Sequence, residues 1–139
     1  MVQIFIDNGM EAMVYGETPT DDPMHLNDIQ PVLTNGPYWK KGDVFISLRS
    51  QSMLMLYRPS TNKVLWYQQG PWLQQHDVDI VDNHTIAVFS NNNTLVGMKG
   101  TNQIYMYDFQ SKKITEPFKT AFATLKIRTE TEGLYNLIR

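Results

Sequence analysis

An internal repeat with a period of about fifty residues most constrains what this chain folds into. The matching segments, in order along the two units, are residues 25–29 with 76–80, 43–47 with 85–89, 56–57 with 106–107, and 63–64 with 113–114. The first match is the pattern H-x-x-D-I at an offset of 51, and the last two have an offset of 50. Such a period is typical of repeat proteins, in which each unit buries its apolar face against the next unit.

Each unit divides into four short strands. Runs of about 5–9 residues rich in Val, Ile, Tyr, Phe and Leu alternate with turn residues, as is typical of antiparallel strands. The predicted strands are 26–33, 43–48, 53–57 and 63–67 in the first unit and 78–81, 85–89, 103–107 and 113–116 in the second. The segment 118–128 comes nearest to a helical apolar period, but its β-branched residues favour a strand or an extended connection. The sequence therefore predicts an all-β chain.

Period and strand number together predict a β-propeller segment with two complete blades, residues 24–67 and 75–117. Residues 1–17, with strands at 2–6 and 12–15, are expected to be outer strands of a preceding blade. Residues 133–139, with a strand at 134–138, are expected to begin the next blade. A closed ring needs at least about four blades, so we expect part of a longer protein that self-associates through exposed blade faces. A small β-sandwich, or a chain that closes by oligomerising, is the alternative.

Composition excludes several classes of function. Twelve basic against 14 acidic residues give a net charge of −2, which argues against nucleic acid as a partner. The longest apolar runs, such as residues 53–57, are far shorter than the roughly 20 residues of a membrane-spanning helix. The absence of cysteine excludes disulfides, thiolate metal sites and a cysteine nucleophile, and it leaves the compartment open. No common nucleotide, hydrolase or zinc motif occurs, so we expect no cofactor and no metal.

Three residues are candidates for a functional site at one end of the propeller channel. His25 and His76 hold matching positions at the start of the innermost strand of each unit. Arg49 follows the second strand of the first unit. A single histidine among polar residues is usually a hydrogen-bonded surface or core residue, but its recurrence at matched positions favours a ligand site. Two imidazoles and one guanidinium would converge there.

Other polar and aromatic residues carry weaker signals. Asp77, Asp79 and Asp82 match no calcium-loop spacing, so a solvated turn is the favoured interpretation. His84 lies in a predicted turn and is assigned no role. Packing between blades accounts for most of the aromatic residues Tyr38, Trp39, Trp66, Tyr67 and Trp72. Trp72 has an alternative interpretation, as the wall of a site for an aromatic ligand.

Three blocks, residues 22–29, 42–51 and 75–77, resemble in their order and spacing the arylsulfotransferase family of six-bladed propellers. The resemblance covers roughly residues 20–110. It implies that His76 is transiently sulfurylated, whereas His25 and Arg49 hold the sulfuryl group. It also implies an aryl sulfate donor, a phenolic acceptor, independence from 3'-phosphoadenylyl sulfate, and an extracytoplasmic location for the intact protein.

The residue types suit this chemistry. A neutral imidazole is a nucleophile that carries no charge at neutral pH, and a guanidinium presents a planar fork of donors to sulfuryl oxygens. His25 would bind the third oxygen or protonate the leaving phenolate. The competing hypothesis is a non-catalytic propeller module that binds a ligand or a partner protein, because a fold does not determine a function.

Overall fold

The computed structural model describes residues 1–14, 22–92 and 100–126, and this part of the chain contains two four-stranded antiparallel sheets. The first sheet consists of β1 (Leu26–Pro31), β2 (Val44–Leu48), β3 (Met53–Arg58) and β4 (Lys63–Gln69). The second consists of β5 (His76–Ile80), β6 (Thr85–Ser90), β7 (Gln103–Asp108) and β8 (Lys113–Thr115). In each sheet the strands follow one another in chain order. The prediction of an all-β chain with two four-stranded units is confirmed.

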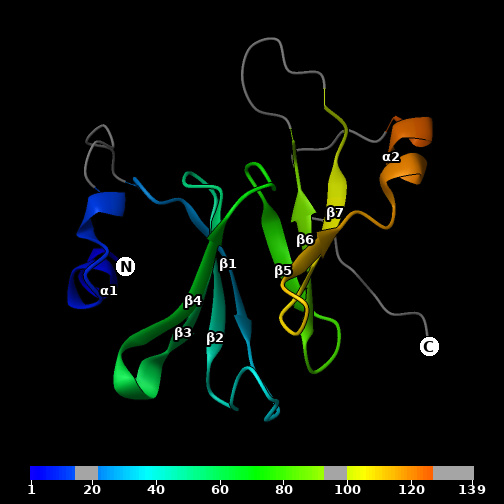
Figure 1. The fold of residues 1–139 in the computed structure, drawn as a ribbon. Coiled ribbons are helices and arrows are strands. Elements are labelled where there is room, and N and C mark those ends of the chain that lie inside the picture. The colour runs from blue at the N-terminus through cyan, green and yellow to red at the C-terminus, as the bar shows by residue number, and fades with distance from the viewer. Residues whose placement is uncertain (15–21, 93–99, 127–139) are drawn as a thin grey trace.

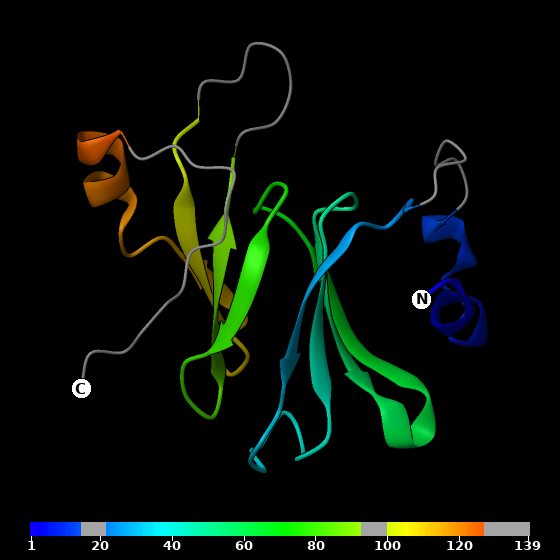
Figure 2. The ribbon, with the colours of Figure 1, turned by 180° about the vertical axis from the view of Figure 1, so that it is seen from behind.

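The two sheets lie beside each other like neighbouring propeller blades, with β1 and β5 adjacent in the middle (Figure 1, Figure 2). The two innermost strands are joined through side chains. The side-chain amide of Asn27 donates a hydrogen bond to the carbonyl of Gln75 at 2.7 Å. This arrangement is a propeller-like segment of two blades, because each sheet keeps its own ladder of strands.

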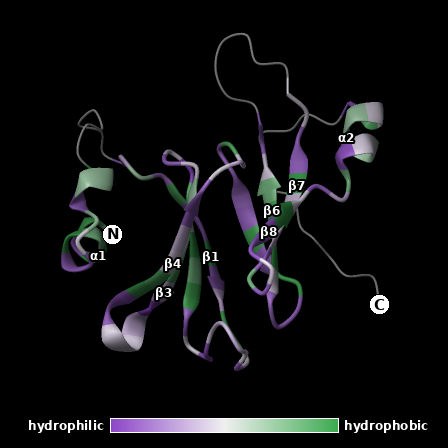
Figure 3. Cartoon of the chain, viewed as in Figure 1, coloured by the Kyte–Doolittle hydropathy of each residue, from purple (hydrophilic) through white to green (hydrophobic). Residues whose placement is uncertain are grey.

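A shared apolar core fills the space between the sheets. Its buried members come from both sheets and from the connections between strands, namely Val32, Trp39, Phe45, Leu54, Leu56, Trp72, Val78, Ile86, Val88, Tyr105, Tyr107 and Phe109. Apolar residues lie along the strands of both sheets in Figure 3. Phe45 packs within this core, with its ring centroid 5.5 Å from that of Trp39 and 6.1 Å from that of Phe109. The interpretation of the aromatic residues as packing between the blades holds for this cluster.

The N-terminal segment is helical where strands were predicted. The expected strands at 2–6 and 12–15 are replaced by α1 (Val2–Asp7) and the 3₁₀ helix η1 (Glu11–Met13), so the outer strands of a preceding blade are absent from residues 1–14. The β-branched residues Val2, Ile4 and Ile6 had favoured a strand. Tertiary packing overrides that preference, because the helix buries Phe5 completely against the first sheet.

The same segment covers the face of the first sheet that points away from the second. Phe5 packs there in a second cluster with Met24, Ile46, Leu48, Met53 and Met55. Exposed blade faces were expected at both ends of a two-blade segment, but this face is not exposed. Self-association through exposed blade faces stays a prediction.

A second difference lies after β8. Residues 118–128 were predicted as a strand or an extended connection, but α2 (Lys119–Leu125) is an α-helix. Its alanines and leucine favour a helix more than Thr120 and Thr124 disfavour it, and Lys126 ends the helix in the left-handed conformation. The fourth short helix is η2 (Pro59–Thr61), between β3 and β4. The predicted strand at 134–138, and with it the proposed start of a next blade at 133–139, lies outside the described residues.

The strand ladders confirm the sequence match in the second and third strands of the two units. Val44 pairs with Tyr57, and the residues matched with them, Ile86 and Tyr107, also pair.

The inner strands do not follow the sequence match. Leu26 lies opposite Leu48 in the first sheet, and the next residue of β1 is skipped in the register. His76 lies opposite Phe89 in the second sheet, and again the next residue is skipped. The sequence match pairs Phe89 with Ser47, and Ser47 lies opposite Asp28, so the ladders do not place His76 and His25 at equivalent positions. Each inner strand contains a bulge, which sequence matching does not reveal.

Candidate functional site

His25 and Arg49 are neighbours at one end of the first sheet. His25 immediately precedes β1, and Arg49 immediately follows β2. The backbone N–H of Arg49 donates a hydrogen bond to the carbonyl of His25 at 3.0 Å. This bond continues the β1–β2 ladder by one position beyond Leu26 and Leu48. The fold therefore brings together two of the three residues that the sequence singled out.

The third residue, His76, begins the inner strand of the second sheet. β5 starts beside the start of β1, as the bond from Asn27 to the Gln75 carbonyl requires. A second link follows, in which the backbone N–H of Val78 donates to a carboxylate oxygen of Asp28 at 2.9 Å. All three candidates therefore belong to one end of the two inner strands, the end at which β1 and β5 begin.

The guanidinium of Arg49 reaches toward the connection that leads into β5. Its Nη2 donates a hydrogen bond to Oε1 of Gln74 at 2.9 Å. Gln74 stands two residues before His76, and Arg49 is half-buried. This bond is a direct side-chain link between the end of β2 and the segment that carries His76. Sequence reasoning did not single out Gln74.

His25 is the most accessible of the three candidates. Its side chain is 47% exposed, and its Nδ1 lies 3.5 Å from a carboxylate oxygen of Asp22. The backbone N–H of His25 donates to the other carboxylate oxygen of Asp22 at 3.0 Å. The backbone of His25 is left-handed, with φ of 44°. Asp22 thus fixes the loop before β1 and lies close to the imidazole.

Gln75 is a buried residue that anchors the start of β5 to the first sheet. Its side chain is completely buried, and its Nε2 lies 3.0–3.1 Å from Ser47 Oγ, the Leu48 carbonyl and the Met53 carbonyl. Three acceptors at the end of β2 and the start of β3 thus surround one amide group. The Q-H pair at residues 75–76 was visible in the sequence, but this anchoring role was not.

Trp72 is a core residue and does not line a site. Its side chain has no exposed surface, and its ring centroid lies 6.4 Å from that of Tyr105. Packing is therefore the correct one of the two interpretations given to Trp72.

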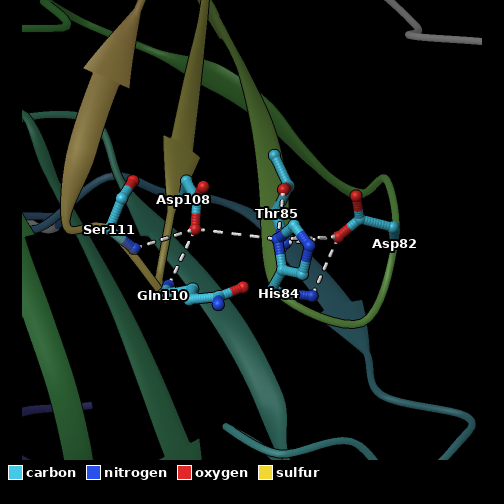
Figure 4. A network of polar contacts seen from close by, with 6 residues as sticks. All are labelled: Asp82, His84, Thr85, Asp108, Gln110 and Ser111. Atoms are coloured by element: carbon cyan, nitrogen blue, oxygen red, sulfur yellow. Dashed lines mark hydrogen bonds and ion pairs between the residues drawn. The ribbon is translucent and has the colours of Figure 1, made fainter.

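His84 belongs to a polar network at the opposite end of the second sheet (Figure 4). A carboxylate oxygen of Asp82 accepts the backbone N–H groups of His84 at 2.8 Å and Thr85 at 2.7 Å, as in a side-chain-stabilised turn. His84 Nδ1 lies 2.9 Å from Thr85 Oγ1 and 3.6 Å from Asp108 Oδ1. Backbone N–H donation from Ser111, the largest cause, and from Gln110 lowers the pKa of Asp108. The network orders two turns.

A metal centre finds no support in the part of the chain that the structure describes. There, no three histidine or acidic side chains are grouped closely enough to hold a metal ion. Asp77, Asp79 and Asp82 do not gather into such a group there. In the same residues, no helix has the length and apolar character needed to cross a membrane.

Comparison with known proteins adds one finding to this geometry. The family model described as Arylsulfotransferase (ASST) matches residues 1–139. Neither the curated proteins nor the solved structures contain a match to this chain.

Proposed function

Because this chain belongs to the arylsulfotransferase family, we propose that it transfers a sulfuryl group from an aryl sulfate to a phenolic acceptor. In this proposal His76 is the nucleophile. Arg49 binds the oxygens of the sulfuryl group, and His25 exchanges a proton with the phenols or binds the remaining oxygen. Residues 24–67 and 75–117 are, in the same proposal, consecutive blades of a propeller that continues beyond the described sheets.

The observation that carries the proposal is the joining of three chain segments at one end of the inner strands. The loop before β1 is bonded to the residue after β2, since Arg49 N–H donates to the His25 carbonyl at 3.0 Å. The residue after β2 is bonded to the segment before β5, since Arg49 Nη2 donates to Gln74 Oε1 at 2.9 Å. Two imidazoles and a permanently charged guanidinium suit a site that binds an anionic sulfuryl group and provides a nucleophile for its sulfur atom.

The first half-reaction forms one bond and breaks one. A neutral ring nitrogen of His76 attacks the sulfur of the aryl sulfate, and the S–O bond to the aryl group breaks. The phenolate leaves with the electron pair of that bond and takes a proton from His25 or from solvent. Because the sulfuryl oxygens keep their negative charge throughout, a fixed guanidinium stabilises the transition state without gaining or losing a proton.

The second half-reaction reverses the first with a different phenol. The acceptor loses its proton to His25 or to solvent, and its oxygen attacks the sulfur of sulfo-His76. The N–S bond breaks, and the imidazole is restored with its electron pair. The scheme uses no metal and no nucleotide, and the two substrates bind in turn, so ping-pong kinetics are expected.

The test is a transfer assay on the protein with an aryl sulfate whose phenol is chromogenic and with a second phenol as acceptor. Wild-type protein should release the first phenol and sulfate the second. His76→Ala and Arg49→Ala should abolish transfer, whereas His84→Ala, a histidine at the opposite end of the sheet, should leave it within about twofold. Transfer that survives in His76→Ala would reject the proposal in favour of a module that only binds.

A further inference from the structure

Gln74 and Arg49 belong to a closed set of hydrogen bonds. Arg49 Nη2 donates to the side-chain oxygen of Gln74 at 2.9 Å. The backbone N–H of Gln74 donates to Ser52 Oγ at 3.2 Å. The backbone N–H of Ser52 donates to the carbonyl of Arg49 at 3.1 Å, which closes the set. Arg49 is thereby bonded through its guanidinium to Gln74 and through its backbone carbonyl to Ser52.

The backbone of this set is unusual for side-chain-bearing residues. Gln74 has a φ of 46° and Ser52 a φ of 49°, both in the left-handed region that favours glycine. Residues persist in this region only where the surrounding structure holds them. Here the structure holds them, because Gly70 N–H donates to the Ser52 carbonyl at 2.9 Å and Leu73 N–H donates to Ser90 Oγ at 2.9 Å. These hydrogen bonds therefore fix the backbone from which the Gln74 side chain extends.

The next residue fixes the segment further. Gln75 is buried against the end of β2, with its Nε2 at 3.1 Å from the Leu48 carbonyl, the residue before Arg49. The segments that carry Arg49 and Gln74 are therefore held together at the same end of the first sheet.

The chemistry of Gln74 suits a residue that orients a cation and leaves its charge in place. The amide oxygen is neutral, so it accepts one of the five N–H donors of the guanidinium without neutralising it. A carboxylate at the same distance would form an ion pair with Arg49 and compete with an anionic ligand. A neutral acceptor is what an anion-binding arginine needs from its support.

We propose that Gln74 is a positioning residue that holds the Arg49 guanidinium toward the sulfuryl group. The inference rests on the proposed function, because it takes Arg49 as the group that binds the sulfuryl oxygens. Gln74 itself touches neither substrate nor nucleophile, and it acts through the direction and the undiminished charge of Arg49.

The experiment compares two substitutions of similar length. Gln74→Met removes the acceptor and keeps the volume, whereas Gln74→Glu adds a carboxylate beside Arg49. The dissociation constant of inorganic sulfate, measured by isothermal titration calorimetry, should rise several-fold in Gln74→Met and at least tenfold in Gln74→Glu. Because protonation removes the added charge, sulfate binding by Gln74→Glu should recover as the pH falls toward the ordinary glutamate range, about 4. KM for the aryl sulfate should rise in the same order, with a smaller change in kcat.

Gln110→Glu is the matched control, because Gln110 is exposed in the turn between β7 and β8 at the opposite end of the second sheet. It adds the same charge and should leave sulfate affinity within about twofold, as expected for a distant charge screened by salt. Equal sulfate affinities in Gln74→Glu and Gln110→Glu would overturn the inference, and so would a wild-type protein that binds no sulfate. If the wild type binds sulfate without transferring it, the proposed function fails. The inference then stands, provided that Gln74→Glu weakens that binding and the melting temperatures of the two Glu variants agree.

Discussion

Asp28 and Val78 join the two inner strands by a hydrogen bond of 2.9 Å from the Val78 backbone N–H to the Asp28 carboxylate. The bond connects β1 to β5, which belong to separate sheets. In a single continuous sheet, backbone hydrogen bonds would join β1 and β5 at this place. A side chain of one sheet thus satisfies a backbone group of the next, and this sets the two blades against each other near the candidate site.

Removing this link should loosen the contact between the sheets. Asp28→Ala leaves the part-buried Val78 N–H without this acceptor, and the free energy of unfolding should fall by about 1–3 kcal/mol. Asp28→Asn keeps an acceptor oxygen and should cost less. Urea unfolding followed by tryptophan fluorescence measures both variants. Equal stabilities of Asp28→Ala and the wild type would show that the bond contributes nothing.

The shared core should make the two sheets unfold together. Phe45→Ala removes a fully buried ring that packs on Trp39, Trp66 and Phe109, so it should lower the free energy of unfolding by about 3–5 kcal/mol. Tyr67→Ala, at a side chain that is 47% exposed, should change it by less than about 0.5 kcal/mol. Calorimetry should give one transition for the wild type. Two separate transitions would contradict a common core.

The N-terminal helix should be held in place mainly by one side chain. Phe5→Ala removes the fully buried residue of α1, so the helix should detach and expose the apolar residues Ile46 and Met55 of the first sheet. We expect increased dye binding to apolar surface and concentration-dependent self-association in analytical ultracentrifugation. Ile6→Ala, which changes a half-exposed residue of the same helix, is the control. A monomeric Phe5→Ala protein with no added dye binding would show that α1 does not protect this face.

A buried ion pair should make stability depend on acidic pH. Arg58 donates two hydrogen bonds of 2.7 Å to the carboxylate of buried Asp43, and these bonds lower the pKa of Asp43, with a smaller contribution from the Lys40 backbone N–H. Because the folded pKa is below the unfolded one, this stabilisation is complete above the unfolded pKa of about 4. It is lost as the pH falls through the lower folded pKa.

Asp43→Asn tests this relationship, because the variant cannot titrate at this position. It should be less stable than the wild type by about 2 kcal/mol at neutral pH, and the difference should shrink below about pH 4. The urea midpoints of both proteins, measured from neutral pH to below about pH 4, test this expectation. A difference that stays constant with pH would contradict a role for the charge of Asp43.

Much of the fold could be predicted because the strands carry alternating apolar residues that repeat in two units. The helix α1 could not, since its β-branched residues favour a strand and only the burial of Phe5 in a distant sheet reverses that preference. The match between the two units holds for the second and third strands but not for the inner strands, because inner-strand bulges leave no mark in the sequence.

The candidate site could be predicted in part. His25, Arg49 and His76 carry chemistry that is recognisable from residue type, and they belong to the end of the sheets at which β1 and β5 begin. The convergence of their side chains on one anion stays a prediction. Gln74 was missed because it is an uncharged residue in a connecting segment, where no periodicity signals a role. Its contact with Arg49 joins two turns that each contain a left-handed residue, Ser52 and Gln74.

The most direct test of the account is mass spectrometry of the protein after incubation with an aryl sulfate in the absence of an acceptor. We predict that one SO₃ group is added, that it maps to the peptide that contains His76, and that it is removed when a phenol is supplied. The adduct should be absent from His76→Ala and present in His84→Ala. A wild-type protein without the adduct, or a His76→Ala protein that still carries it, would contradict the central claim.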